Sequence, residues 1–282
     1  MMECMMAQSF GPAELAAFYE RPAEAVLADP VLPTAHAALL AALEAGQVRA
    51  VLPGPDGWQV QRWVKQAILF GFRHTGLAEM IGFGMPAIDK AAFPPRLFQT
   101  ADGVRLVPGG SAVRRGAYVA PGVVIMPPAY INVGAYVDEG TMVDSHALVG
   151  SCAQIGKRVH LSAAAQIGGV LEPAGAMPVV VEDEAFVGGL VGLFEGIRVG
   201  SRAVLAAGVV LTASTVVYDL VHGCQRQREI PPGAVVVPGT RPASGAFAQE
   251  RGLQVAAPLI VKYRDARTDA ATELEAALRL TP

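Results

Sequence analysis

The fold is decided by the stretch VRRGAYVAPGVVIMPPAYINVGAYVDEGTMVDSHALVGSCAQIGKRVHLSAAAQI, which runs from Val113 to Ile167. Every sixth residue is Val, Ile or Leu: Val113, Val119, Ile125, Ile131, Val137, Val143, Val149, Ile155, Leu161 and Ile167. Four residues after each of the first nine, the side chain is small or β-branched. Glycines stand one place earlier at Gly116, Gly122, Gly134 and Gly140, where a tight turn needs a positive φ. A period of six fits neither a helix nor an alternating strand and predicts a parallel β-helix of hexapeptides.

A second run with the same period follows and extends the predicted β-helix. Its members are Val181, Val187, Leu193, Val199, Leu205, Leu211 and Val217. The step from Ile167 to Val181 is two residues longer than two hexapeptides, so we expect an extruded loop over Leu171–Pro178, which contains two prolines. Three hexapeptides make one triangular coil of 18 residues, and the two runs together predict roughly six coils with the aliphatic side chains inside.

The flanking segments carry different signals. Residues 12–18, 34–45 and 59–72 are predicted to be helical; Thr34 is expected to cap the second helix and Gly46 to end it. After the coils, residues 257–263 are predicted to form a strand and 265–280 an amphipathic helix, which together would cap the open end of the β-helix. We therefore expect an N-terminal helical domain over 1–105, the β-helix over 106–240 and a C-terminal strand–helix cap over 241–282.

Composition narrows the class of protein. The chain has 282 residues, of which 52% are apolar and 17% charged, so it can build a core. Its net charge of −3 provides no basic field for nucleic acid. Three scattered cysteines argue against a disulfide scaffold and fit a reducing compartment. The N-terminus does not read as a signal peptide, and no apolar run reaches the ~18 residues that a membrane span requires. These features predict a soluble cytoplasmic protein.

One block of the repeat is more specific than the period alone. The stretch NVGAYVDEGTMVDSHALVGSCAQIGKRVHLS from Asn132, followed by IGGVLEP from Ile167, resembles the tetrahydrodipicolinate N-succinyltransferase family of lysine and diaminopimelate biosynthesis. The likeness extends to WVKQAILFGFR at Trp63, RLVP at Arg105, VVVPGTRP at Val235 and LIVKYRDARTDAATELEAALR at Leu259. It covers nearly the whole chain, including the predicted helical domain.

The resemblance implies a fold, an activity and an assembly. It implies a left-handed β-helix, a cytoplasmic homotrimer, and transfer of an acyl group from succinyl-CoA to the amino group of a dicarboxylate acceptor. The CoA is expected along the groove between neighbouring coils and the acceptor at the subunit interface. By motif, Arg105 matches the family arginine that binds a substrate carboxylate, and Asp144 matches the aspartate at the acceptor amine. An arginine fork suits a carboxylate, and a carboxylate can take the amine's proton during attack.

Three more residues are candidates for the site. Ser162 lies 18 residues after Asp144 and is expected to stack one coil above it. His160 is expected near the same groove, either as a base or as a structural hydrogen-bonding group. Gly192 belongs to the triplet Leu190, Val191, Gly192, which stands where the family has Arg-Ser-Glu with an active-site glutamate. At His146 the family typically has Trp, and at Val216 it has a basic residue, so neither position inherits a role.

The departures leave alternatives open. One is a divergent paralogue that uses another donor, such as acetyl-CoA, or another acceptor, in a secondary pathway such as tabtoxin biosynthesis. A second is a scaffold without catalysis, and a third is the zinc-dependent γ-carbonic anhydrase class. The third needs three suitably placed histidines, and these are not evident in the sequence. No metal is therefore expected. The altered triplet predicts a less charged acyl donor than succinyl-CoA.

Overall fold

The computed structural model describes residues 10–55, 57–82 and 85–265 of the chain. Four helices open the described part: α1 (Pro12–Tyr19), α2 (Ala23–Leu27), α3 (Leu32–Glu44) and α4 (Arg62–His74). Two antiparallel hairpins accompany them: β1 (Val51–Gly54) with β2 (Gly57–Val60), and β3 (Leu77–Gly82) with β4 (Met85–Lys90). A short 3₁₀ turn, η1 (Thr100–Asp102), leads into the coils.

The predicted helices are present, but two of their boundaries were wrong. Thr34 is not a cap, because α3 already starts at Leu32, with Pro33 in its first turn, where a missing N–H is tolerated. The helix predicted over 59–72 runs from Arg62 to His74 instead, because residues 57–60 pair with β1 in a hairpin. Gly46 does end α3, with a φ of +69°.

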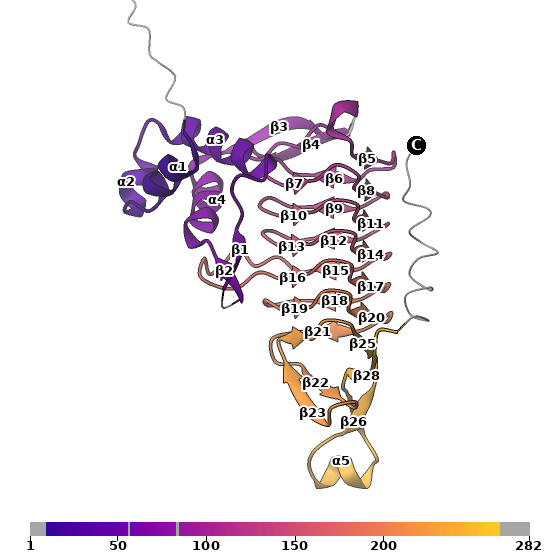
Figure 1. The fold of residues 1–282 in the computed structure, drawn as a ribbon. Coiled ribbons are helices and arrows are strands. Elements are labelled where there is room, and N and C mark those ends of the chain that lie inside the picture. The colour runs from indigo at the N-terminus through magenta and orange to yellow at the C-terminus, as the bar shows by residue number, and fades with distance from the viewer. Residues whose placement is uncertain (1–9, 56, 83–84, 266–282) are drawn as a thin grey trace, which may run out of the picture.

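The body of the molecule is the predicted three-sided parallel β-helix, with one two-residue strand on each side of most coils (Figure 1). The β7 face consists of β7 (Tyr118–Val119), β10 (Tyr136–Val137), β13 (Gln154–Ile155), β16 (Val180–Val181), β19 (Arg198–Val199) and β24 (Glu229–Ile230). The β6 face consists of β6 (Ala112–Val113), β9 (Tyr130–Ile131), β12 (Leu148–Val149), β15 (Gln166–Ile167), β18 (Gly192–Leu193) and β21 (Val210–Leu211).

The β5 face is longer because the C-terminal strands join it. It consists of β5 (Arg105–Leu106), β8 (Val124–Ile125), β11 (Met142–Val143), β14 (His160–Leu161), β17 (Phe186–Val187), β20 (Val204–Leu205), β25 (Ala234–Val237), β28 (Leu259–Tyr263), β22 (Val216–Asp219) and β23 (Cys224–Gln227). Strand β28 lies between β25 and β22 and so covers the end of the coils. The predicted strand over 257–263 is thus present, whereas the helix predicted over 265–280 lies almost entirely outside the described residues.

The sixth-residue aliphatics form the core, as the period predicted, with one exception. The predicted coil position at Val217 was wrong: residues 216–219 leave the coil to pair with β23 and β28, and Ile230 stacks on Val199 instead. The second residue of each coil strand is buried, and residues 18 apart pair in register, for example Val119 with Val137 and Val143 with Leu161. The glycines at Gly116 and Gly122 have φ values of +79° and +78°, which is the turn conformation that their spacing required. Each coil therefore repeats the same inward and outward positions, and outward residues line up in columns along each face.

The extruded loop between Ile167 and Val180 connects the β-helix to the N-terminal helices. The chain between Ile167 and Val180 leaves the coil and contacts α4, where the fully buried Lys65 ammonium donates to the carbonyl oxygens of Pro173 at 3.1 Å and Ala176 at 2.7 Å. Burial of the ammonium lowers the pKa of Lys65. The helical domain is thereby tied to the middle of the β-helix as well as to its first coils.

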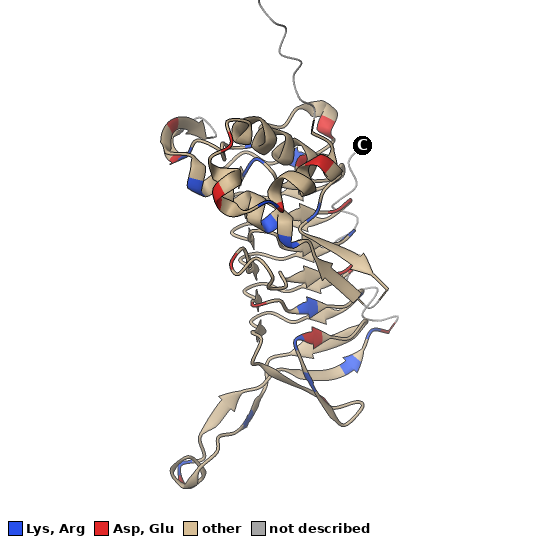
Figure 2. Cartoon of the chain, turned by 90° about the vertical axis from the view of Figure 1, so that its left-hand side faces the viewer, with Lys and Arg blue, Asp and Glu red and all other residues tan. Residues whose placement is uncertain are grey.

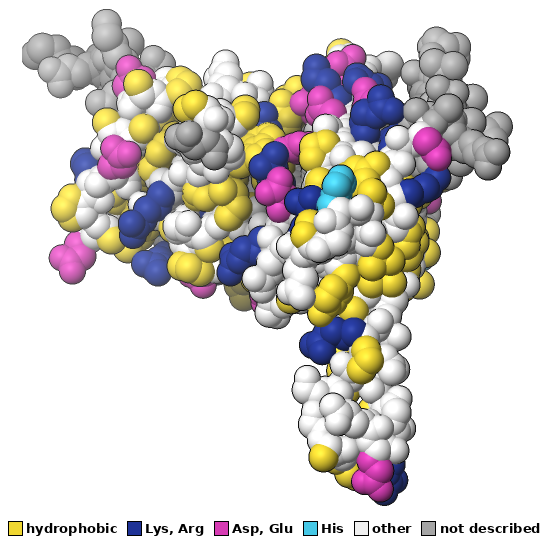
Figure 3. Space-filling view, turned by 60° about the horizontal axis from the view of Figure 1, so that its bottom comes forward, with side chains coloured by type: hydrophobic (Ala, Val, Ile, Leu, Met, Phe, Trp, Pro, Cys, Tyr) yellow, Lys and Arg dark blue, Asp and Glu magenta, His cyan; other side chains and the backbone are white. Residues whose placement is uncertain are grey.

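The C-terminal segment projects beyond the coils. Strands β26 (Thr240–Pro242) and β27 (Gln254–Ala256) pair around α5 (Ala246–Glu250) and form an arm that stands away from the body (Figure 3). Elsewhere, acidic and basic residues alternate along the ribbon of the described part of the chain in Figure 2. No helix in the described part of the chain is both long and apolar enough to cross a bilayer.

Candidate functional site

The candidate site lies along one corner of the β-helix, where the chain passes from the β5 face to the β6 face. We call this the Asp144 corner; it consists of residues 126–128, 144–146, 162–164, 188–190 and 206–208. Backbone bonds hold these turns in register: the Asp144 N–H donates to the Leu161 carbonyl, and the Ser162 N–H to the Val187 carbonyl. Ser162 therefore occupies the position one coil along from Asp144, as its spacing predicted.

Asp144 presents a carboxylate that is only partly engaged. Its side chain is half-buried, and Oδ1 accepts the backbone N–H of Ser145 at 2.7 Å. Within the described ranges, no cation pairs with this carboxylate and Oδ2 receives no hydrogen bond. The Ala147 N–H closes the turn on the Asp144 carbonyl. The turn thus fixes the carboxylate's position and leaves one oxygen available to an amine.

Arg105 lies in the first strand of the β5 face, in the outward column that also contains Val124, Met142 and His160. Strand β5 pairs with β8 and β8 with β11, so Arg105 is two coils before Met142, which precedes Asp144 by two residues. Two steps between parallel strands amount to about 10 Å. The Arg105 side chain is exposed and has no ion pair with any residue that the structure describes. An accessible guanidinium on the β5 face and an accessible carboxylate at the adjoining corner are therefore separated by two coils and by two residue positions along the strand.

His160 does not point into an open groove. It is 8% exposed, and its ring stacks on Phe186 with centroids 4.9 Å apart and planes 4° from parallel. It occupies the outward column of the β5 face between Met142 and Phe186. This packing favours a structural role over that of a base. The structure thus stacks Asp144 and Ser162 at one corner, while Arg105 and His160 share the outward column of the adjoining β5 face.

The altered triplet begins at the Asp144 corner, two coils beyond Asp144. Leu190 is 70% exposed at the corner, in a left-handed turn with φ of +61°. Gly192 opens β18 on the β6 face, in the outward column that also contains Leu148 and Gln166. A Cβ atom on Gly192 would lie 2.7 Å from Cε2 of Phe194. The space beside Gly192 is thus occupied by an aromatic ring, a feature that the sequence motif did not reveal.

The described residues contain no group of three or more His, Cys, Asp or Glu side chains that could hold a metal ion. Cys152 is buried, which raises its pKa to about 12 and leaves the thiol protonated and inert at neutral pH.

Comparison with known proteins gives two family matches. Residues 16–74 match the model described as tetrahydrodipicolinate N-succinyltransferase N-terminal, and residues 178–213 match the hexapeptide repeat of succinyl-transferase. A solved structure from Campylobacter jejuni, named as a 2,3,4,5-tetrahydropyridine-2-carboxylate N-succinyltransferase, shares 16% identity with a TM-score of 0.43. The matched region covers 85% of this chain and 64% of the Campylobacter jejuni chain.

Two curated relatives match most of the chain at higher identity. Both are named 2,3,4,5-tetrahydropyridine-2,6-dicarboxylate N-succinyltransferase. The protein from Zymomonas mobilis is 44% identical over 242 residues, which are 85% of this chain and 87% of the relative. The protein from Gluconobacter oxydans is 46% identical over 251 residues, which are 86% of this chain and 87% of the relative. The resemblance seen in the sequence motifs is therefore confirmed, and with it the left-handed β-helix class: the chain belongs to the tetrahydrodipicolinate N-succinyltransferase family.

Proposed function

We propose that the protein is a CoA-dependent N-acyltransferase that acylates the amino group of a small dicarboxylate at the Asp144 corner. The observation that carries the proposal is the accessible Asp144 carboxylate at a corner of the β-helix, with the accessible Arg105 two coils earlier on the adjoining β5 face, in a chain of this family. Arg105 would bind an acceptor carboxylate through its planar fork. Asp144 would hold the amine so that its nitrogen lone pair faces the thioester.

The chemistry needs one proton acceptor and no redox partner. The acceptor nitrogen attacks the thioester carbon, the new C–N bond forms, and the C–S bond breaks with CoA leaving as a thiolate. The proton lost by nitrogen passes to the available Oδ2 of Asp144 and from there to the departing sulfur. A carboxylate in this position acts as general base and then general acid. Asp144 is catalytic in this scheme, whereas Arg105 and Ser162 contact the substrates.

The acyl donor follows from the surroundings of Gly192. A succinyl group carries a distal carboxylate, which is costly to bury without a cation or several donors. Leu190 supplies neither, and the Phe194 ring lies over Gly192. We therefore expect a donor with a small uncharged acyl group, such as acetyl-CoA, to be preferred over succinyl-CoA.

The decisive experiment offers both donors with tetrahydrodipicolinate and compares kcat/KM. A higher value with acetyl-CoA supports the proposed preference, whereas faster turnover with succinyl-CoA would overturn it and leave the family's usual donor. Calorimetric titration with acetyl-CoA, succinyl-CoA and free CoA tests the scaffold alternative at the same time. Failure of all three to bind would contradict the enzyme proposal as a whole.

We also expect a closed homotrimer in a cytoplasmic setting. In support, the outer face of the β3–β4 hairpin exposes large apolar side chains on a single chain: Leu77 is 72% exposed, Ile81 67% and Ile88 69%. Exposed apolar surface of this kind is typical of an interaction site, and identical chains usually close it by symmetry. Sedimentation equilibrium at micromolar concentration should give three times the chain mass. A stable monomer would contradict the trimer.

A further inference from the structure

A second cavity lies away from the Asp144 corner, between the β1–β2 hairpin and the β7 face of the β-helix. Its volume is about 300 Å³, near the lower end of small-molecule sites. Its charged and aromatic walls are Arg49, Trp58, Asp138, Glu182 and Asp183, and Gly156 forms part of the floor. It lies at the corner where the chain passes from the β7 face to the β5 face. The Asp144 corner is at the other end of the β5-face strands.

Arg49 provides a cation that forms no ion pair within 4 Å with the residues placed by the structure, although Asp138 and Asp183 act on it electrostatically from across the cavity. Its guanidinium carbon lies 3.6 Å from the centroid of the Tyr136 ring, and its Nε donates to Oε1 of Gln154 at 3.0 Å. Its two terminal amino groups form no hydrogen bond with any residue in the described ranges. Burial lowers the pKa of Arg49, but a guanidinium stays charged at neutral pH. A partly desolvated fork of this kind suits a carboxylate, which it can bind through two parallel bonds.

Glu182 is already satisfied and serves to position Trp58. Its Oε1 accepts the Trp58 indole N–H at 2.9 Å and the Arg198 Nε–H at 2.9 Å, and its Oε2 accepts the Ser201 backbone N–H at 3.1 Å. It pairs with Arg198, which also lies 3.6 Å from the Glu229 carboxylate outside the cavity. The indole ring is held beside the cavity by this bond, where it offers an apolar wall to methylene groups.

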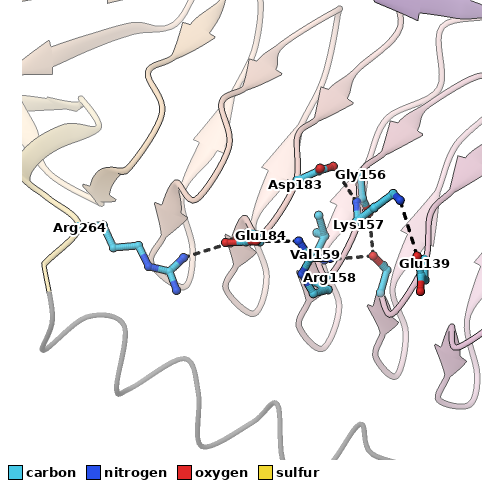
Figure 4. A network of polar contacts seen from close by, with 9 residues as sticks. Glu139, Gly156, Lys157, Arg158, Val159, Asp183, Glu184 and Arg264 are labelled. Atoms are coloured by element: carbon cyan, nitrogen blue, oxygen red, sulfur yellow. Dashed lines mark hydrogen bonds and ion pairs between the residues drawn. The ribbon is translucent and has the colours of Figure 1, made fainter.

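The other two carboxylates face the cavity and form no ion pair within 4 Å; Arg49, on the same lining, acts on them only at longer range. Asp138 uses Oδ1 to accept the Glu139 backbone N–H, and Asp183 uses Oδ1 to accept the Lys157 backbone N–H, both at 2.8 Å. Neither forms an ion pair with any side chain in the described ranges. The nearby Lys157 ammonium is turned toward Glu139 at 3.6 Å, and Figure 4 shows Asp183 beside Gly156 and Lys157 at this corner. Each aspartate thus keeps an oxygen for an ammonium group.

The spacing of the aspartates follows from the coil register. Asp138 donates its N–H to Ile155, and Gly156 donates its N–H to Val181, so the Asp138, Gly156 and Glu182 positions are successive coils of one column. Asp183 is the next residue after Glu182, two coils or about 10 Å from Asp138 along the axis. A Cβ atom on Gly156 would approach Oδ1 of Asp183 to 2.4 Å, so glycine keeps the floor between the two carboxylates open.

These groups together define the charge of a ligand. Arg49 contributes one positive charge and Asp138 and Asp183 two negative charges, so the lining outside the Glu182–Arg198 pair sums to −1. A ligand would match this lining if it carried one carboxylate for Arg49, two ammonium groups for the aspartates and an aliphatic chain for the indole. We propose that this cavity binds a basic amino acid, a diamino monocarboxylate, at the boundary between the helical domain and the β-helix.

Binding is tested on the full-length protein by calorimetry, with L-lysine and L-ornithine as probes. L-norleucine lacks the second ammonium, and cadaverine lacks the carboxylate. We expect at least one probe to bind at least about tenfold more tightly than both analogues, a factor that corresponds to ~1.4 kcal/mol. Because Trp58 is one of only two tryptophans, its fluorescence should change on saturation, and Trp58→Phe should abolish that change. Equal affinities for lysine and cadaverine, or no saturation by about 10 mM, would overturn the proposal.

Variants assign the binding to these residues. Arg49→Lys keeps the charge over Tyr136 but removes the fork, and Asp138→Asn and Asp183→Asn keep an oxygen that can accept the backbone N–H. Each should weaken lysine binding about tenfold or more, while circular dichroism shows that the variant is folded. Glu139→Gln is the matched control: this carboxylate neighbours Asp138, is 65% exposed and pairs with Lys157 outside the cavity. Unchanged affinity in both Asn variants would refute the assignment. The readout is binding, so the result is independent of acyl transfer.

Discussion

The ring of Phe194 lies over the backbone of Gly192, so that a Cβ atom on the glycine would meet the ring at 2.7 Å. The same ring also covers Gly168 one coil earlier, where an added Cβ would lie 2.7 Å from Cδ1. The two glycines and the phenylalanine are therefore a packed unit. Gly192, where the resemblance leads us to expect a glutamate, thus packs against a bulky side chain two residues later.

This packing predicts a non-additive pair of substitutions. Gly192→Glu alone should destabilise the protein by about 1–3 kcal/mol, because the new side chain must displace the ring. Gly192→Glu combined with Phe194→Val should recover most of that loss, which chemical denaturation would show as a favourable coupling energy. The double variant should also shift the ratio of kcat/KM toward succinyl-CoA if the ring sets donor choice. Additive effects on stability would show that the ring and the glycine are independent.

Asp144 is predicted to dominate the chemical step. Asp144→Ala should lower kcat/KM by more than about tenfold, which corresponds to at least ~1.4 kcal/mol of transition-state stabilisation. Asp144→Asn should behave similarly, because an amide can keep the bond to the Ser145 N–H but cannot take a proton. Glu139→Gln, an exposed carboxylate five residues earlier, is the control and should leave the rate unchanged. A smaller effect at Asp144 than tenfold would remove it from the mechanism.

Lys65 is predicted to hold the extruded loop rather than to stabilise the whole fold. Lys65→Met removes the bonds to Pro173 and Ala176 but also the cost of burying an ammonium, so the global free energy of unfolding should change by less than about 1 kcal/mol. The amide hydrogens of residues 168–179 should exchange about tenfold faster, since local opening becomes easier. Arg62→Met, an exposed position in the same helix, should alter neither measurement. Unchanged exchange in the Lys65 variant would show that the loop is held by other contacts.

His36 is predicted to make the helical domain sensitive to acid. It is 4% exposed and packs edge-on against Phe93, with centroids 5.1 Å apart. Burial, with a smaller effect from His74, lowers the pKa of His36 to about 4 from its usual 6.5. The unfolded chain therefore binds a proton between pH 6.5 and 4 that the folded chain rejects. The contribution of neutral His36 to the free energy of unfolding is therefore fully present above pH 6.5, and it is lost as the pH falls toward 4.

The expected loss from His36 is about 2 kcal/mol between pH 7 and pH 5, at ~1.4 kcal/mol per pH unit below 6.5. Urea denaturation at the two pH values would measure it. His36→Leu should reduce the difference by that amount, whereas His146→Gln, at an exposed corner, should not. An identical pH dependence in wild type and His36→Leu would show that other groups cause the acid sensitivity.

The coils could be predicted from the sequence because their signal is local and repeated. The same six-residue unit specifies an inward aliphatic at Val119, Val137 and Ile155 alike, and parallel pairing stacks each unit on its copy. Register is therefore contained in the spacing, and the stacking of Ser162 beyond Asp144 followed from a count of 18. The motif around Asp144 also sufficed to identify the family.

The structural features that the six-residue spacing did not predict depend on contacts between residues far apart in the chain. The β1–β2 hairpin replaces the start of a predicted helix, and its Trp58 is held by Glu182, 124 residues later. Arg49 meets Gln154 across 105 residues, and Lys65 meets Pro173 across 108. No period links such pairs, so neither the second cavity nor the attachment of the loop could be anticipated. Local periodicity determines where each side chain points within a coil. Which distant side chain it then meets is set by the packing of the helical domain against the coils, since burial and charge pairing are satisfied only in the folded chain.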